Sequence, residues 1–272
     1  MPFVTIEDRT MHYLDIGQGE TLIFGHSFLW NAGMWRPQIE LLSQKYRCIV
    51  PDFWAHGQSE FPPSSMQNLT DYAGHILQLA DELNIESFSI VGLSVGGMWG
   101  AELTALAPER VKTLILADTF VGLEPEVNHD KYFAMLNTII ANQSFPSVVQ
   151  EQMLPMFFAP RSLDGNAGYV QDFRQYISNV SGDAALQIAS VGKMIYSRRD
   201  LFDDIEKFAL PVLIMVGAED RFHPVLESYL MHDSITGSEL VIVPNAGHIS
   251  NLEQTQFFNQ ALSDFLFRTL HK

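Results

Sequence analysis

Apolar residues along the chain gather in short continuous runs, and longer segments with helix-like spacing lie between these runs. Six runs rich in Val, Ile and Leu predict strands, because strands covered on both faces of a parallel sheet carry few polar residues. They span residues 21–26, 47–52, 88–93, 113–118, 212–217 and 239–244. Ahead of them, residues 4–17 predict an antiparallel hairpin.

Helix-like segments separate or follow these strands. Residues 71–84 carry Ile76, Leu79, Ala80 and Leu83 at helical spacing, and Thr70 or Asp71 is the expected cap. Residues 96–109 and 254–270 are the other two predicted helices. Alternation of strand and helix is typical of the α/β class, so the chain predicts a mostly parallel, doubly wound sheet.

The alternation stops between residues 121 and 200, where no run resembles a strand. The stretch is too long for an ordinary connection and is rich in Phe, Met and Tyr. We therefore expect a core domain made of residues 1–120 and 201–272, with residues 121–200 inserted as a helical cap. Most of the cap's Met and aromatic side chains should form its own core, and a minority should line a ligand pocket.

The sequence GLSVGG at residues 92–97 fits the pattern G-x-S-x-G, with a predicted strand before it and a helix after it. A side chain at Gly92 or Gly96 would collide with neighbouring backbone in so tight a turn. The turn would then present Ser94 as an exposed nucleophile, although a glycine-rich turn can also hold an incidental serine. The spacing fits neither a phosphate loop nor a dinucleotide fingerprint.

A serine nucleophile needs a base and an acid that orients the base. In this type of fold the chain order is Ser, acid, His. His248 follows the last predicted strand and Asp220 follows the one before it, on the sheet edge where Ser94 lies. Glu219 and Asp118 are rival acids.

The backbone N–H groups of Phe28 and Val95 are the expected oxyanion hole, since one donor follows the nucleophile and the other follows an earlier strand. We expect His26 to order the loop that contains Phe28 rather than to act as a base. Trp30, Met156 and Phe157 are candidate residues of the substrate pocket, and Trp30 fits a place in the core equally well.

Composition narrows the possible partners. The net charge of −16 argues against nucleic acid and anionic membrane surfaces as partners. Cys48 is the single cysteine, which excludes an intrachain disulfide and a cysteine-based metal site. The N-terminal sequence does not resemble a signal peptide, and no apolar run is long enough to span a membrane. We therefore expect a cytoplasmic protein.

The motifs HSFLW, PDFWAHGQS, GLSVGG, GAEDRFHP and NAGHISNLEQ together resemble the α/β-hydrolase family over nearly the whole chain. Within it, the chain is similar to carboxylesterases and 3-oxoadipate enol-lactone hydrolases. Two positions depart from the family pattern: Ser27 and Ala55 stand where glycines are usual. Serine at position 94, in place of aspartate, separates the chain from the haloalkane dehalogenase and epoxide hydrolase branches.

The resemblance implies a serine hydrolase that cleaves esters of small to medium acyl groups through an acyl-enzyme. Its partner would be a small-molecule ester or lactone, and neither a metal nor an organic cofactor is implied. Enol-lactone hydrolysis and C–C bond hydrolysis by the same residues are alternatives. A small-molecule receptor that keeps the fold without catalysis is a further one.

Overall fold

The computed structural model describes residues 2–270, and its centre is a twisted sheet of eight strands. In spatial order the sheet is β1-β2-β4-β3-β5-β6-β7-β8. The strands are β1 (Phe3–Ile6), β2 (Arg9–Ile16), β3 (Glu20–Gly25), β4 (Tyr46–Pro51), β5 (Phe88–Leu93), β6 (Val111–Ala117), β7 (Val212–Gly217) and β8 (Glu239–Val243). Strands β3 to β8 are parallel, whereas β2 pairs antiparallel with both β1 and β4.

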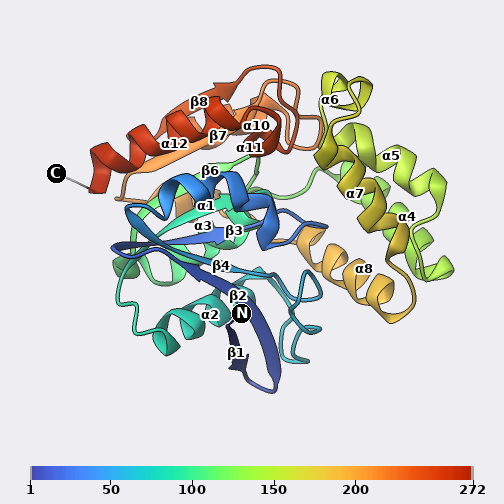
Figure 1. The fold of residues 1–272 in the computed structure, drawn as a ribbon, viewed down its shortest axis with the longest axis horizontal. Coiled ribbons are helices and arrows are strands. Elements are labelled where there is room, and N and C mark those ends of the chain that lie inside the picture. The colour runs from blue at the N-terminus through green and yellow to red at the C-terminus, as the bar shows by residue number, and fades with distance from the viewer. Residues whose placement is uncertain (1, 271–272) are drawn as a thin grey trace.

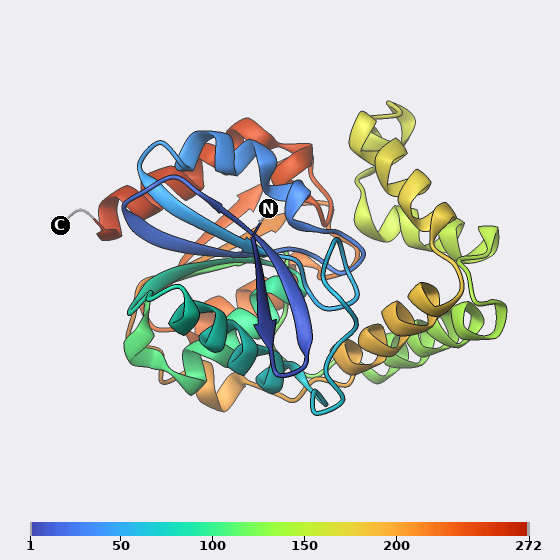
Figure 2. The same cartoon turned by 60° about the horizontal axis from the view of Figure 1, so that its bottom comes forward.

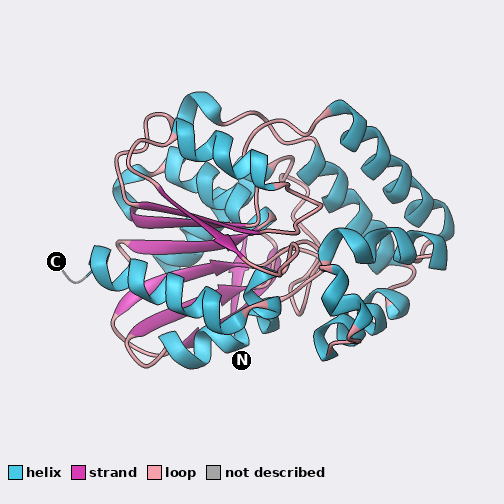
Figure 3. Ribbon diagram, turned by 90° about the horizontal axis from the view of Figure 1, so that it is seen from above, coloured by secondary structure: helices cyan, strands magenta, loops and turns pink. Residues whose placement is uncertain are grey.

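The predicted α/β class with a mostly parallel sheet is confirmed. All six predicted strands and the N-terminal hairpin overlap strands of the structure. Every residue of β5 and β7 is buried, because helices cover both faces of the sheet (Figure 3). This double cover explains why these runs contain so few polar residues.

The helices that cover the sheet include the three that the sequence predicts. These are α2 (Leu69–Glu82), α3 (Val95–Leu106) and α12 (Thr255–Leu270). The expected cap of α2 was wrong: Asn68, in an extended conformation, accepts a hydrogen bond from the backbone N–H of Asp71, whose carboxylate accepts one from Asn68 in return. The sequence analysis did not anticipate α1 (Arg36–Leu42), α9 (Phe202–Ile205), α10 (Val225–Ser234), α11 (Ser250–Glu253), or the 3-10 helices η1 (Ala32–Trp35) and η2 (Pro108–Arg110).

Residues 121–200, called the cap segment below, fold into helices. They are α4 (Glu126–Asn142), α5 (Ser147–Phe157), α6 (Pro160–Asp164), α7 (Gly168–Asn179) and α8 (Asp183–Tyr196). Figures 1 and 2 show these helices gathered to one side of the sheet and its covering helices. The division of the chain into a core domain and a cap domain stays a prediction.

The two ends of the cap segment lie side by side. The backbone N–H of Leu201 donates to the carbonyl of Val121 at 3.1 Å. Arg198 joins the same two stretches, because its Nε donates to the carbonyl of Gly122 at 2.9 Å and its Nη1 pairs with Glu124 at 2.8 Å. Both charged side chains of this ion pair are buried.

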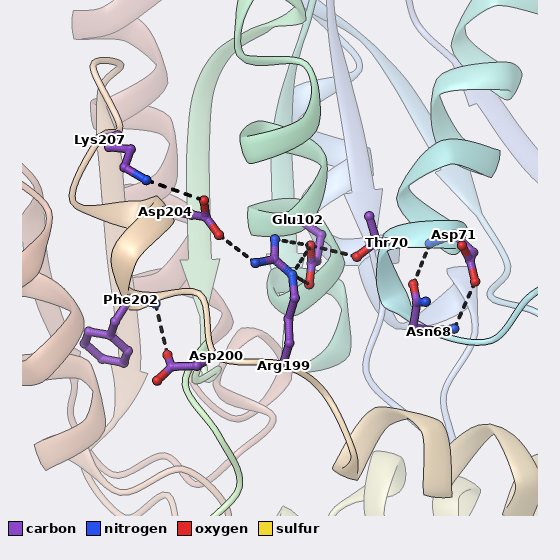
Figure 4. Close-up of polar contacts among 9 residues, drawn as sticks. All are labelled: Asn68, Thr70, Asp71, Glu102, Arg199, Asp200, Phe202, Asp204 and Lys207. Atoms are coloured by element: carbon purple, nitrogen blue, oxygen red, sulfur yellow. Dashed lines mark hydrogen bonds and ion pairs between the residues drawn. The ribbon is translucent and has the colours of Figure 1, made fainter.

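The next residue, Arg199, connects the end of the cap segment to helix α3 (Figure 4). Its guanidinium forms two hydrogen bonds, of 3.0 and 2.8 Å, with the two carboxylate oxygens of Glu102 on α3. Glu102 is buried and also accepts a hydrogen bond from the Thr70 hydroxyl on α2, while Arg199 also pairs with Asp204 at 2.6 Å. The cap segment is therefore fixed to the helix that begins directly after Ser94.

Candidate functional site

Ser94 lies in a strained turn between β5 and α3, with φ +58° and ψ −121°. Non-glycine residues adopt positive φ rarely and at a cost of about 1–3 kcal/mol. A Cβ atom at Gly92 would overlap the carbonyl oxygen of Gly96, and one at Gly96 would overlap the carbonyl oxygen of Gly25 at the end of β3. The predicted collision with backbone is confirmed, and it explains why glycines flank this serine.

Backbone hydrogen bonds hold Ser94 against the neighbouring strand β6. Its N–H donates to the carbonyl of Ala117 at 2.9 Å, and its carbonyl accepts from the Thr119 hydroxyl at 2.7 Å. Its own hydroxyl forms no hydrogen bond with any residue in the described range. The Ser94 side chain is thus positioned by its backbone and available to a ligand.

His248 follows β8 and contacts Asp220, which follows β7. His248 Nδ1 lies 2.9 Å from Asp220 Oδ2, and both side chains are fully buried. The other carboxylate oxygen, Oδ1, accepts the backbone N–H groups of Phe222 at 2.8 Å and His223 at 3.0 Å. With Nδ1 directed at the carboxylate, the lone pair of His248 Nε2 is free to accept a proton.

His248 Nε2 is buried, and no described residue is its hydrogen-bond partner. The structure therefore brings Asp220 and His248 together but does not join His248 to Ser94. Hydrogen bonds between a base and a nucleophile are often long without substrate and shorten in the complex.

The two rival acids have other contacts. Asp118, at the end of β6, accepts the backbone N–H of Gly217 at 2.8 Å and the Ser250 hydroxyl at 2.5 Å. Burial, followed by the charge of Asp220, raises the pKa of Asp118 well above its usual range. Glu219 is exposed. Neither carboxylate is bonded to His248 among the described residues.

Two neutral histidines order the loop after β3. His26 Nε2 accepts the backbone N–H of Phe53 at 2.8 Å, and its Nδ1 lies 2.8 Å from the carbonyl of Ser27. His56 Nε2 accepts the backbone N–H of Leu29 at 3.0 Å. Burial lowers the pKa of both rings, that of His56 to about 3. His26 therefore supports the loop, as the sequence indicated.

Both expected oxyanion donors are free of hydrogen bonds to described residues. Val95 is the first residue of α3, so its N–H has no acceptor within the helix. Neither this N–H nor that of Phe28 donates to another described residue. The Ser27 hydroxyl, which stands where the family usually has glycine, is buried without a hydrogen-bond partner in the described range.

A small cavity of about 10 Å³, the space of one water molecule, lies between this loop and the cap segment. Its lining is Phe28, Tyr132, Met135, Leu136, Ile139, Met153, Met156, Tyr196 and Phe222. The Phe222 ring stacks on the His248 ring with 4.8 Å between centroids, which places the cavity beside the histidine.

The three candidate pocket residues lie in different places. Met156 lines the small cavity. Phe157 packs its ring edge-on against His248 at 5.6 Å. Trp30 stacks on Phe173 at 5.4 Å and lines a separate groove of about 350 Å³ between the loop after β3 and α7.

Sequence reasoning missed Phe222, the two tyrosines of the cavity, and a buried polar cluster beside His248. In this cluster His223 Nδ1 lies 2.8 Å from Glu227 Oε2. Burial raises the pKa of Glu227 to about 7 and, with the nearby His248, lowers that of His223 to about 3. The position of Phe222, two residues after Asp220, was the only available sequence signal.

Within residues 2–270, no three His, Cys, Asp or Glu side chains are close enough together to hold a metal ion. None of the helices in that range has the length and apolarity to cross a membrane.

The sheet order, the serine turn and the histidine–aspartate pair define a class of protein, and comparison with known families agrees. Residues 20–255 match the model of the alpha/beta hydrolase fold family, and the chain belongs to that family.

Among curated proteins, 3-oxoadipate enol-lactonase 2 of Acinetobacter baylyi is 28% identical over 97% of this chain and 96% of its own. Carboxylesterase YbfK of Bacillus subtilis is 25% identical over 90% of this chain and 80% of its own. A solved thermophilic esterase from Thermogutta terrifontis superposes with a TM-score of 0.87 over 96% of this chain and 94% of its own. Its sequence identity is 24%, so this likeness shows the fold alone.

Proposed function

We propose that the protein is a serine hydrolase that cleaves carboxylic esters of small to medium acyl groups. The observation that carries this proposal is the buried His248–Asp220 pair, whose free Nε2 lies at the sheet edge that also presents Ser94. This arrangement provides a nucleophile, a base and an orienting acid.

In this proposal the Ser94 hydroxyl attacks the ester carbonyl and His248 Nε2 takes its proton. The N–H groups of Phe28 and Val95 stabilise the oxyanion. His248 then gives the proton to the leaving alcohol, and Asp220 stabilises the imidazolium that forms in between. Water, activated by the same histidine, releases the acid and restores the serine.

The helices of residues 121–200 act as a cap over the acyl group, with Met156 at the cavity and Phe157 against His248. An enol-lactone is a second candidate substrate, because the relative that is 28% identical bears the name of an enol-lactonase. A lactone is an internal ester, so the same residues serve both reactions.

The test is hydrolysis of p-nitrophenyl acetate and butyrate by the purified protein and by Ser94→Ala. Loss of the nucleophile should lower turnover by about 10⁴ to 10⁶. Ser89→Ala is the matched control, because Ser89 is buried on β5, the strand that leads to Ser94, and its hydroxyl has no partner in the described range. Near-normal activity in Ser94→Ala contradicts the mechanism. A wild-type protein that hydrolyses neither esters nor lactones supports a receptor instead.

A further inference from the structure

We propose that the cavity beside His248 admits only uncharged acyl groups, so that the protein hydrolyses esters of neutral monocarboxylic acids and rejects substrates with a second, free carboxylate. This inference rests on the proposed function and narrows its substrate class.

The cavity lies where an acyl group would be held. Phe28 supplies one wall, and its backbone N–H is a proposed oxyanion donor. Phe222 supplies another wall, and its ring stacks on His248. An acyl chain that extends from a carbonyl bound between these two elements therefore enters this cavity, and the alcohol side faces away from it.

The cavity walls carry no charge. All nine lining residues are aliphatic, aromatic or methionine side chains, and the hydroxyls of Tyr132 and Tyr196 are the polar side-chain groups among them. Neither hydroxyl has a hydrogen-bond partner among the described residues. Because the cavity is small, an acyl chain must displace its flexible walls, chiefly the unbranched side chains of Met135, Met153 and Met156.

The charged groups behind these walls are mostly acidic. Those that act on the Tyr132 hydroxyl are three acids and one base, namely Glu124, Glu227, Asp220 and Arg198. The base is already paired, since Arg198 Nη1 lies 2.8 Å from Glu124 in a fully buried ion pair. A carboxylate in the cavity would lose its hydration and face excess negative charge, so binding it would be unfavourable.

One group opposes this conclusion. Arg198 Nη2 is buried without a hydrogen-bond partner in the described range, so it is a cationic donor that a substrate carboxylate could pair with. We assign it no such role because Glu124 is bound to the same guanidinium and the charge of Arg198 also acts on Glu227. The experiment below separates the two interpretations.

The test compares two ethyl esters of equal size and shape, ethyl 4-methylpentanoate and monoethyl succinate, in which a carboxylate replaces an isopropyl group. Hydrolysis is followed in a pH-stat at pH 8, with ethyl acetate as a third substrate. We expect kcat/KM for the neutral ester to exceed that for the anionic ester by about 100-fold or more, since an unpaired carboxylate is costly to desolvate.

A pair of variants tests the role of charge in the cavity. Met153→Lys adds a cation to the cavity wall and should reduce the preference for the neutral ester by about 10-fold or more. Met153→Leu, which is similar in volume and uncharged, should keep the wild-type preference. Circular dichroism checks that both variants fold.

The remaining outcomes overturn the inference. Equal hydrolysis of the two matched esters does so, and a loss of succinate ester hydrolysis alone in Arg198→Gln would identify Arg198 as a carboxylate site. If ethyl acetate is hydrolysed but ethyl 4-methylpentanoate is not, the cavity does not admit an acyl group of that size. No hydrolysis of any ester contradicts the proposed function itself.

Discussion

At the scale of single residues, two buried aspartates at neighbouring strand ends have different contacts. Asp220 binds the imidazole of His248, whereas Asp118 holds the Ser250 hydroxyl and the Gly217 N–H. Asparagine at position 220 presents an amide to His248 Nδ1 and favours the wrong tautomer, so Asp220→Asn should lower turnover by about 10⁴.

Asp118→Asn is the matched comparison. The side-chain oxygen of the asparagine can still accept a hydrogen bond from the Gly217 N–H, and its amide N–H can donate one to the Ser250 hydroxyl. We expect turnover to stay within about 10-fold of the wild-type value. A larger loss in Asp118→Asn than in Asp220→Asn would assign the acid to Asp118 instead.

The raised pKa of Glu227 should make the stability of the protein depend on pH. Burial raises its pKa from 4.5 to about 7, so between these values the folded state binds more protons than the unfolded state. The contribution of Glu227 to the free energy of unfolding should therefore fall as pH rises from about 4.5 to about 7, by up to about 3 kcal/mol. Glutamine cannot ionise. The free energy of unfolding of Glu227→Gln, relative to that of wild type, should therefore be higher at pH 8 than at pH 5.

Urea unfolding at the two pH values measures this difference. Asp233→Asn is the control, because Asp233 lies exposed on the same helix α10. If the stability difference between Glu227→Gln and wild type is the same at both pH values, the pKa of Glu227 is not raised in the folded protein.

At the scale of elements, the sequence was informative where one local pattern decides the structure. Strands β5 and β7 are buried along their whole length, so each of them appears as a continuous apolar run. Helix α10 was missed because Leu226, Tyr229 and Leu230 point outward and its apolar face is weakly marked. The cap of α2 was misplaced because Asn68 and Asp71 cap each other, and the helix starts between them.

Loss of the Arg199 contacts between α3 and the cap segment should destabilise the protein. Arg199→Ala would leave the buried Glu102 carboxylate with Thr70 as its remaining side-chain partner. Because Arg199 is half exposed, we expect a modest loss of about 1–2 kcal/mol in the free energy of unfolding.

Lys207→Ala is the control for Arg199→Ala. Lys207 is largely exposed and lies 3.9 Å from the shared partner Asp204, so its loss should change stability by no more than about 0.5 kcal/mol. Equal effects of the two substitutions would show that the Glu102 contact does not stabilise the fold.

At the scale of the whole molecule, the site divides into a predictable and an unpredictable part. Ser94, Asp220 and His248 each follow a recognisable strand, and parallel strands end at one edge, so their placement at the same sheet edge follows from the topology. The cavity residues Tyr132 and Tyr196 lie on different helices, α4 and α8. The faces that these helices turn toward the core depend on packing between distant segments, which no local pattern records.

The net charge and the size of the cavity together predict which acyl-chain lengths are hydrolysed fastest. The net charge of −16 opposes adsorption to anionic lipid, and the cavity beside His248 is small. We expect kcat/KM to be highest from acetate to butyrate and to fall at least about 10-fold at octanoate. Activity should not rise when the substrate exceeds its solubility limit. A rise toward palmitate esters, or activation at an oil–water interface, contradicts this expectation.

The hydrogen bond between Leu201 and Val121 has a consequence for how the chain can change in length. Because the chain leaves and rejoins the sheet region at adjacent points, the cap segment is a loop whose ends are already closed. Each doubling of such a loop costs only about 0.6 kcal/mol of closure entropy. Helices can therefore be lengthened, removed or exchanged between these two points without breaking a strand pairing of the sheet, and the sheet edge that carries Ser94, Asp220 and His248 stays unchanged.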